Sequence, residues 1–253
     1  MDQFVKGLAD NARIIVNKGE YYGNKLSSNK SKEERLAKKA GQLGIFPATI
    51  ERECVKVGGI TCNFFQGVLR SNYNKLDHSG SYRTSNFNWI EDCNKKLYTI
   101  GKYKDISNIS NKLIETGIEG YHVVIFSHHY INRFKERNNA YITMLGDYRE
   151  AIIYDLLSVY TYFANIERTK SINSDENLAN LLNFIKDMSG VEDEEIVRKY
   201  INFEDLISIK RTVNGYGIFR IKDDIITMIT WINEKMLDKN QKKLFNYITI
   251  EEL

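Results

Sequence analysis

The dipeptide Asn214-Gly215 constrains the fold more than any other feature, because both residues tolerate the positive φ angles of a type I′ hairpin turn. It separates two strand-like runs, 207–213 and 216–221, and a third apolar run follows at 225–232. Strands joined in sequence by short turns form an antiparallel meander. The carboxyl-terminal part is therefore expected to contain three neighbouring antiparallel strands.

The middle of the chain predicts a strand followed by a helix. The apolar run 121–126 has the length of a strand, and Ser127 stands where an N-cap residue would begin a helix over 128–138. Apolar residues recur at helical spacing over 147–165, which predicts a long helix with one face in a core. Shorter helices are expected at 174–187, 192–200 and 234–247.

The amino-terminal part is less regular. Residues 1–44 predict two polar helices separated by a loop at 19–29. The segments that follow predict a helix at 51–57 ended by Gly58-Gly59, a long loop at 72–88, and a short helix ending at Gly117 and Gly120. We therefore expect an α+β protein with a helical, loop-rich basic region at 1–115. An α+β domain at 116–253 would hold a small antiparallel sheet packed by several helices.

Composition indicates a folded protein with unevenly placed charge. Charged residues make up 27% of the 253 residues and apolar residues 42%, which argues against disorder. Residues 1–145 carry 22 Lys and Arg against 14 Asp and Glu, whereas residues 146–208 carry 6 against 13. The basic bias permits RNA or another polyanion as a partner. No signal peptide or membrane-spanning run is visible, so no membrane partner and a location in the cytoplasm or a virion are expected.

The cysteines predict neither a disulfide framework nor a metal site. Three cysteines are an odd number for disulfides, which favours a reducing compartment. Cys54, Cys62, His78 and Cys93 lack the closely spaced pairs of a recognisable zinc site. The chain also contains no Gly-x4-Gly-Lys-Ser/Thr phosphate loop and no acidic residue two before a lysine. We expect no cofactor and no metal.

The segment 126–137 holds the strongest candidate site. In a helix, His129, Arg133 and Arg137 fall at i, i+4 and i+8 and share one face. An imidazole can move protons near neutral pH, and arginines can stabilise a phosphodiester undergoing cleavage. These three residues are therefore the candidate catalytic group. The alternative is an ordinary polar helix face, since the other side of the same helix is apolar.

Basic residues of the meander could complete this site. Pairing across the predicted turn places Arg211 opposite Ile218 and Ile209 opposite Arg220, so the two arginines share a sheet face. If the helix lies beside that face, its imidazoles and these cations would meet. The candidate nucleic-acid contacts are His128, Lys210, Arg211 and Arg220.

The motif His129-x3-Arg133-x2-Glu136-Arg137 after a strand, with a later meander containing Ile-Ile-Thr-Met-Ile-Thr at 225–230, resembles small phage and mobile-element proteins. These proteins are related to barnase/RelE-type RNase toxins. The similarity covers this helix and about thirty carboxyl-terminal residues. The resemblance implies metal-independent RNA cleavage, with the histidine and two arginines at the matching positions.

Two other functions fit parts of the chain. The aromatic residues between 64 and 103 alternate with polar ones, which suits a protein core, a subunit interface or stacking on bases. A phage virion or assembly protein that docks other subunits, or copies of itself, is therefore the main alternative. A weaker alternative is a DNA-binding regulator, because 36–52 partly matches a helix-turn-helix.

Overall fold

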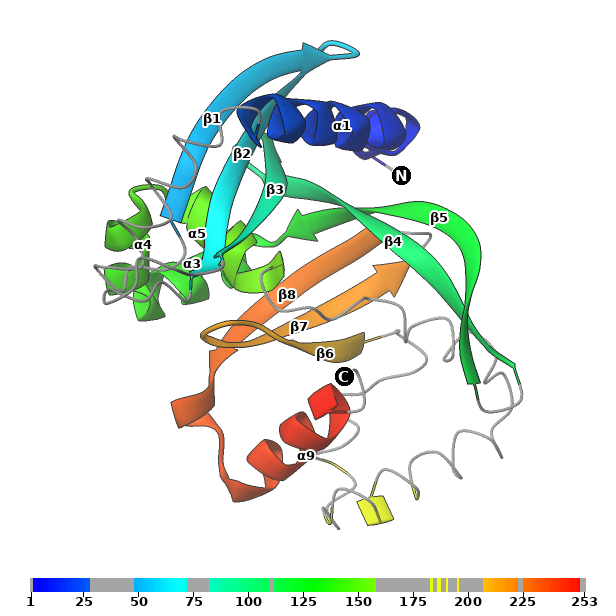
Figure 1. Ribbon diagram of the computed structural model, residues 1–253. Helices are drawn as coiled ribbons and strands as arrows, with labels where there is room; N and C mark the ends of the chain where they lie inside the picture. Colours follow the sequence, from blue (N-terminus) through cyan, green and yellow to red (C-terminus); the bar gives the residue numbers. More distant parts are fainter. Residues whose placement is uncertain are drawn as a thin grey trace, which may run out of the picture. The chain divides into compact units, whose positions relative to one another are not determined.

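The computed structural model describes residues 2–27, 48–71, 82–109, 112–157, 207–222 and 225–250, together with positions 183, 186, 187, 190 and 195. Within these residues the protein is α+β, as the sequence predicts. The chain forms two compact units (Figure 1). Unit 1 comprises Met1–Gly101 and Asn138–Tyr154, and unit 2 comprises Lys102–Arg137 and Asp155–Leu253. Whether the chain divides near residue 115 into independently folding parts stays a prediction.

Unit 1 is an antiparallel sheet between helices. Its elements are α1 (Gln3–Ser27), β1 (Ala48–Val57), β2 (Ile60–Ser71), β3 (Tyr82–Glu91), the start of β4 (Leu97–Ile109), α4 (Asn139–Leu145) and most of α5 (Tyr148–Leu157). The strands pair in chain order. Neighbouring residues of β2 point to opposite faces, so Phe64 stacks on Tyr22 of α1, whereas Phe65 meets Tyr154 of α5.

The predicted helix at 51–57 is wrong, because this segment belongs to β1. Gly58 and Gly59 have φ angles of 56° and 83°, and Val57 pairs directly with Ile60. Positive φ at both central residues is what a two-residue type I′ turn requires. The glycine pair that was expected to end a helix therefore joins two strands.

The predicted loop at 19–29 is also wrong as far as Ser27, because α1 continues through Gly19. A Cβ at this glycine would lie 3.2 Å from a ring carbon of Phe64. Gly19 is thus explained by the close approach of α1 to β2 (Figure 1). The second of the two helices predicted within 1–44, after the loop, lies outside the described residues.

The polar segments expected as a loop and a short helix form strands where they are described. Residues 82–88 belong to β3, and most of 102–120 belongs to β4 and β5 (Lys112–Phe126). Asn88 shows how an asparagine suits this sheet: its Nδ2 donates to the Ile100 carbonyl, and its Oδ1 accepts from the Ile100 amide, both at 2.9 Å. The amide group continues the hydrogen bonding beyond the last paired residues of β3 and β4.

Unit 2 is built on a mixed sheet in the order β5-β8-β7-β6. β5 runs parallel to β8, and the other pairs are antiparallel. The predicted meander is confirmed by β6 (Ile207–Arg211), β7 (Gly215–Lys222) and β8 (Ile225–Asn233) (Figure 1). The chain then forms the short helix η2 (Glu234–Met236) and α9 (Lys239–Ile250).

The helices predicted at 128–138 and 147–165 are confirmed where they fall on described residues, whereas the helix predicted at 234–247 is divided into η2 and α9 with Leu237 and Asp238 between them. The strand at 121–126 is the end of β5, and α3 (His128–Arg137) follows it directly. α5 confirms the long helix from Tyr148 to Leu157. Most of the helices expected at 174–187 and 192–200 lies outside the described residues.

Candidate nucleic-acid interface

The helix α3 begins at a side-chain cap, as the sequence predicts. The Tyr130 amide donates to Ser127 Oγ at 3.0 Å, and the Ser127 hydroxyl donates to the Ile229 carbonyl of β8 at 2.7 Å. The Ser127 amide donates to the Met228 carbonyl at 3.0 Å. These bonds fix the start of α3 to β8.

One side of α3 packs on the sheet of unit 2. Tyr130, Ile131 and Phe134 are buried, as expected for an amphipathic helix. The Phe134 ring meets Trp231 edge-on, with 5.5 Å between ring centroids. A Cβ at Gly217 would lie 3.4 Å from the Tyr130 ring. α3 therefore covers the sheet face to which Gly217 and Trp231 belong.

The other side of α3 carries the histidines and one predicted catalytic arginine. His128 and His129 are exposed. The Arg133 side chain is 43% exposed and forms an ion pair with Glu136 at 3.1 Å. The first turn contains no acidic residue. This surface of His128, His129 and Arg133, here called the α3 surface, is open to a ligand.

Arg137 has a structural partner. Its Nη1 donates to the Trp231 carbonyl at 2.9 Å, so the last turn of α3 is attached to β8. A cation in this position also interacts favourably with the carboxyl end of the helix dipole. Arg137 was expected to contact phosphate together with His129 and Arg133, but this nitrogen is committed to the sheet.

The turn between β6 and β7 differs from the expected type I′ turn. Neither Asn214 nor Gly215 has a positive φ. The loop instead closes through two bonds: the Thr212 amide donates to the Gly215 carbonyl at 2.8 Å, and the Gly215 amide donates to Thr212 Oγ1 at 3.1 Å. A Cβ at Gly215 would lie 2.3 Å from the Ile232 carbonyl oxygen. Glycine is required here by close packing.

The turn is centred one residue earlier than predicted, on Val213 and Asn214, and this moves the register by two residues. Arg211 pairs with Tyr216, whereas the sequence predicted Ile218. Arg220 therefore lies four residues from the partner of Arg211, about 13 Å along the strand, where about 7 Å was expected. The two arginines are too far apart to contact one phosphate together.

The arginines also lie on the face opposite α3. The Tyr216 ring packs against Phe245 of α9 with 5.1 Å between centroids, whereas the next residue, Gly217, faces α3. Side chains alternate along a strand, so Arg211 and Arg220 share the face of Tyr216. The expected grouping of His129 and Arg133 with these arginines is therefore wrong.

Lys210 is a core residue and not the surface contact that the sequence predicts. It pairs with Gly217, so it belongs to the face that α3 covers. Its exposed fraction is only 2%. Lysines are almost never fully buried, and this one does not present its ammonium group to solvent.

The sequence reasoning missed a buried carboxylate in unit 2. Asp155 is 0% exposed, and Asn214 and Trp231 both donate to it. Burial raises its pKa to about 6, although these hydrogen bonds act in the opposite direction. One signal was available, because this aspartate interrupts the apolar side of a predicted helix.

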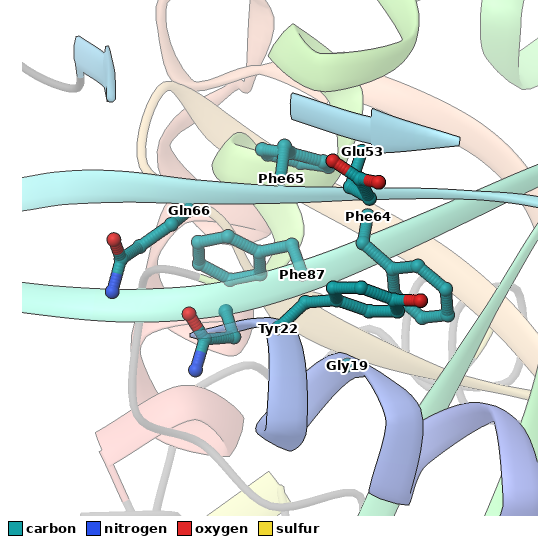
Figure 2. A pocket seen from close by; sticks show the side chains of 8 residues that line it. Gly19, Tyr22, Glu53, Phe64, Phe65, Gln66 and Phe87 are labelled. Atoms are coloured by element: carbon teal, nitrogen blue, oxygen red, sulfur yellow. The ribbon is translucent and has the colours of Figure 1, made fainter. Parts of the chain in front are cut away.

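A small hollow lies in unit 1, on the α1 side of the sheet. Figure 2 shows the rings of Tyr22 and Phe64 beside Phe87 and Gln66, with Glu53 at its edge. The space open to a water-sized molecule is about 10 Å³. Since this volume holds about one water, the hollow is too small for a ligand.

The aromatic and helix-turn-helix interpretations of unit 1 can be compared with the structure. Phe64, Phe65, Phe87 and Tyr98 are buried, which fits the core interpretation for these rings. Residues 48–52 lie in β1, so the second helix expected for a helix-turn-helix is not formed there. The remainder of that motif lies outside the described residues.

The parts of the chain that the structure describes contain no cluster of three or more His, Cys, Asp or Glu that could hold a metal ion. None of the described helices combines the length and apolar character needed to cross a bilayer. Comparison with protein families, with curated proteins and with solved structures gave no match.

Proposed function

We propose that the protein binds RNA through the α3 surface, and that His129 cleaves the bound strand without a metal ion. One observation carries the proposal: His128, His129 and Arg133 project to solvent from a helix attached to the sheet at both ends. An anchored helix holds its exposed side chains in fixed positions relative to one another. Such preorganisation favours both binding and catalysis.

Electrostatics supports an anionic ligand at this surface. α3 has three cationic side chains and one acidic side chain. The first amides of a helix have no acceptor within the helix, and the helix dipole favours negative charge at that end. The exposed Arg133–Glu136 pair is a weak competitor, because surface ion pairs contribute at most about 1 kcal/mol. A phosphate could therefore displace Glu136 from Arg133.

The same groups suit phosphodiester cleavage. Cleavage without a metal requires a base for the 2′-hydroxyl, an acid for the leaving 5′-oxygen and cations for the charge on phosphorus. His129 would exchange the protons. Arg133 lies one helical turn away, about 6 Å along the axis, and would hold the phosphate. A protein with this activity would work in the cytoplasm of its host cell.

RNA binding is tested by the salt dependence of affinity for a single-stranded RNA oligonucleotide. Arg133→Gln should weaken binding and reduce the salt slope by about 0.7, the value for one lost phosphate contact. Arg211→Gln is the matched control, since it removes the same charge from the opposite face of the sheet. Equal loss in both variants would mean that general charge, and not the α3 surface, binds RNA.

Cleavage is tested separately, in EDTA, with RNA and with the same oligonucleotide carrying 2′-deoxyribose. His129→Ala should reduce RNA cleavage at least a hundredfold while RNA binding remains. The deoxy oligonucleotide should bind and stay intact. If RNA binds to the wild-type protein and is never cut, the catalytic part of the proposal fails and the binding part stands.

A second function, assembly with other subunits in a virion, is favoured by the outer side of α1. Ile14 is 49% exposed and Tyr21 is 63% exposed. Seven residues apart, they lie on one face of the helix. Aromatic residues of this kind are enriched at interfaces. Loss of particle incorporation in a Tyr21→Ser variant, with RNA binding unchanged, would support this alternative.

A further inference from the structure

The carboxylate of Asp155 attaches the β6–β7 loop to α5. One oxygen, Oδ1, accepts from the amide and from the side-chain nitrogen of Asn214, both at 2.8 Å. The other, Oδ2, accepts from Trp231 Nε1 at 3.1 Å. The backbone carbonyl of Asp155 accepts from the Val213 amide at 3.0 Å. All these residues belong to unit 2, and the carboxylate is 0% exposed.

The surroundings of this carboxylate contain mostly donors. The Asn214 backbone amide and the Trp231 indole can only donate to it, the Asn214 side chain donates through Nδ2, and the Thr212 hydroxyl also bonds to it. On protonation, the oxygen of the Thr212 hydroxyl can accept the new O–H. Both charge states can therefore be accommodated while the loop stays closed.

Within the part of the chain that the structure describes, two further buried titratable groups lie on this face of the sheet, one from α3 and one from β6. Tyr130 of α3 is fully buried, and burial raises its pKa well above the ordinary value, with the charge of Asp155 acting in the same direction. Lys210 of β6 is buried on the same face of the sheet. β7 and β8 contribute the uncharged Gly217 and Trp231 to that face.

We propose that the β6–β7 loop is a proton-controlled latch, which Asp155 holds more tightly closed as the solution becomes more acidic. The closed loop keeps Asp155 away from water, and any opening that wets this carboxylate restores its ordinary affinity for protons. A state that binds protons more tightly is stabilised by acid. The latch is independent of the proposed RNA binding, although Trp231 also accepts the hydrogen bond from Arg137 of α3.

The size of the effect follows from the two proton affinities. The pKa of Asp155 is about 6 in the closed state, against the ordinary 3.8. A proton therefore binds the closed state about a hundredfold more tightly than the wetted one. Between pH 7 and pH 5 the opening equilibrium should fall about tenfold, because the closed state is mostly ionised at the first pH and mostly protonated at the second.

Amide hydrogen exchange of the wild-type protein measures this equilibrium. The Val213 and Asn214 amides should gain about tenfold in protection from pH 7 to pH 5, after correction for the intrinsic exchange rate. The Gly146 amide, which donates to the Ile142 carbonyl in α4, is the internal control. In Asp155→Asn the two loop amides should lose the pH dependence, because this side chain cannot ionise. Constant or falling protection on acidification of the wild-type protein would overturn the proposal.

A second measurement needs no variant that might fail to fold. The indole N–H of Trp231 donates to Asp155, so its NMR signal should shift with a midpoint near pH 6. The chain has two tryptophans, and Trp89 lies in unit 1 beneath Arg149, so its indole signal serves as the reference. A Trp231 signal that does not move between pH 4.5 and 7.5, about 1.5 pH units on either side of that midpoint, would equally overturn the latch.

Discussion

Gly67 of β2 is a described position where one added methyl group should damage the core. In Gly67→Ala the new Cβ would lie 1.5 Å from the Tyr154 hydroxyl oxygen and 2.3 Å from its ring carbon Cζ. An ordinary contact begins near 3.4 Å, so the ring would have to move by about 2 Å. Tyr154 is fully buried, and its ring lies edge-on to Phe65 and Phe87, 5.2 and 5.0 Å away. Movement on this scale should cost about 3 kcal/mol, the upper end for overpacking in a core.

Urea denaturation followed by circular dichroism measures this cost. Gly101→Ala is the matched control, because nothing lies within 4 Å of a Cβ at that position, and it should change the unfolding free energy by less than about 0.5 kcal/mol. Tyr154→Leu combined with Gly67→Ala should be less unstable than the sum of the single changes, since the clash has gone. If Gly67→Ala proves as stable as Gly101→Ala, the close packing of α5 on β2 is refuted.

Three further predictions concern a buried ion pair, a titrating group and a turn. Arg52→Ala leaves Glu150, which is 2% exposed, without its two hydrogen bonds at 2.6 and 2.9 Å. Because Arg52 itself is 57% exposed, urea denaturation should show a loss of about 2 kcal/mol in the free energy of unfolding. An unchanged free energy would contradict the pairing of Glu150 with Arg52. Burial raises the pKa of Asp155, so its contribution to stability is present below pH 4 and is lost as pH rises through 6. Between pH 4 and 7 the wild-type protein should lose about 2 kcal/mol of stability in this way, and thermal unfolding of Asp155→Asn should lack this fall. Gly59→Ala, at φ 83°, should cost about 1 kcal/mol, and Gly59→Asn less.

Local sequence signals were sufficient to predict the elements around α3. Ser127 precedes an amphipathic segment, and the structure shows the cap and the buried side that this pattern predicts. The amino-terminal sheet could not be recognised in the same way. In β1, Arg52 and Glu53 face opposite sides, so the charged run Glu51-Arg-Glu resembles a polar helix. The signal for a hairpin was Gly58-Gly59, which the sequence analysis used only as the end of a helix.

The prediction of the turn between β6 and β7 failed for a different reason. Asn214-Gly215 is a strong local signal for a type I′ turn, but Asp155 binds the amide and side chain of Asn214 from fifty-nine residues away. This contact holds the turn one residue earlier than predicted, and the register follows from the position of the turn. A sequence pattern cannot contain such a contact, because the partner is identified only once α5 is packed.

The prediction of the site also required knowledge of which helix covers which face of the sheet. Strand periodicity does not supply this. A register error of two residues leaves every side chain on its own face, so Arg211 and Arg220 share a face in the prediction and in the structure. Which helix covers that face is a separate question. Tyr130 on Gly217 and Phe245 on Tyr216 answer it, since they place α3 and α9 on opposite sides. Of the described residues, the two arginines of the sheet therefore cannot assist His129, because they lie on the face opposite α3.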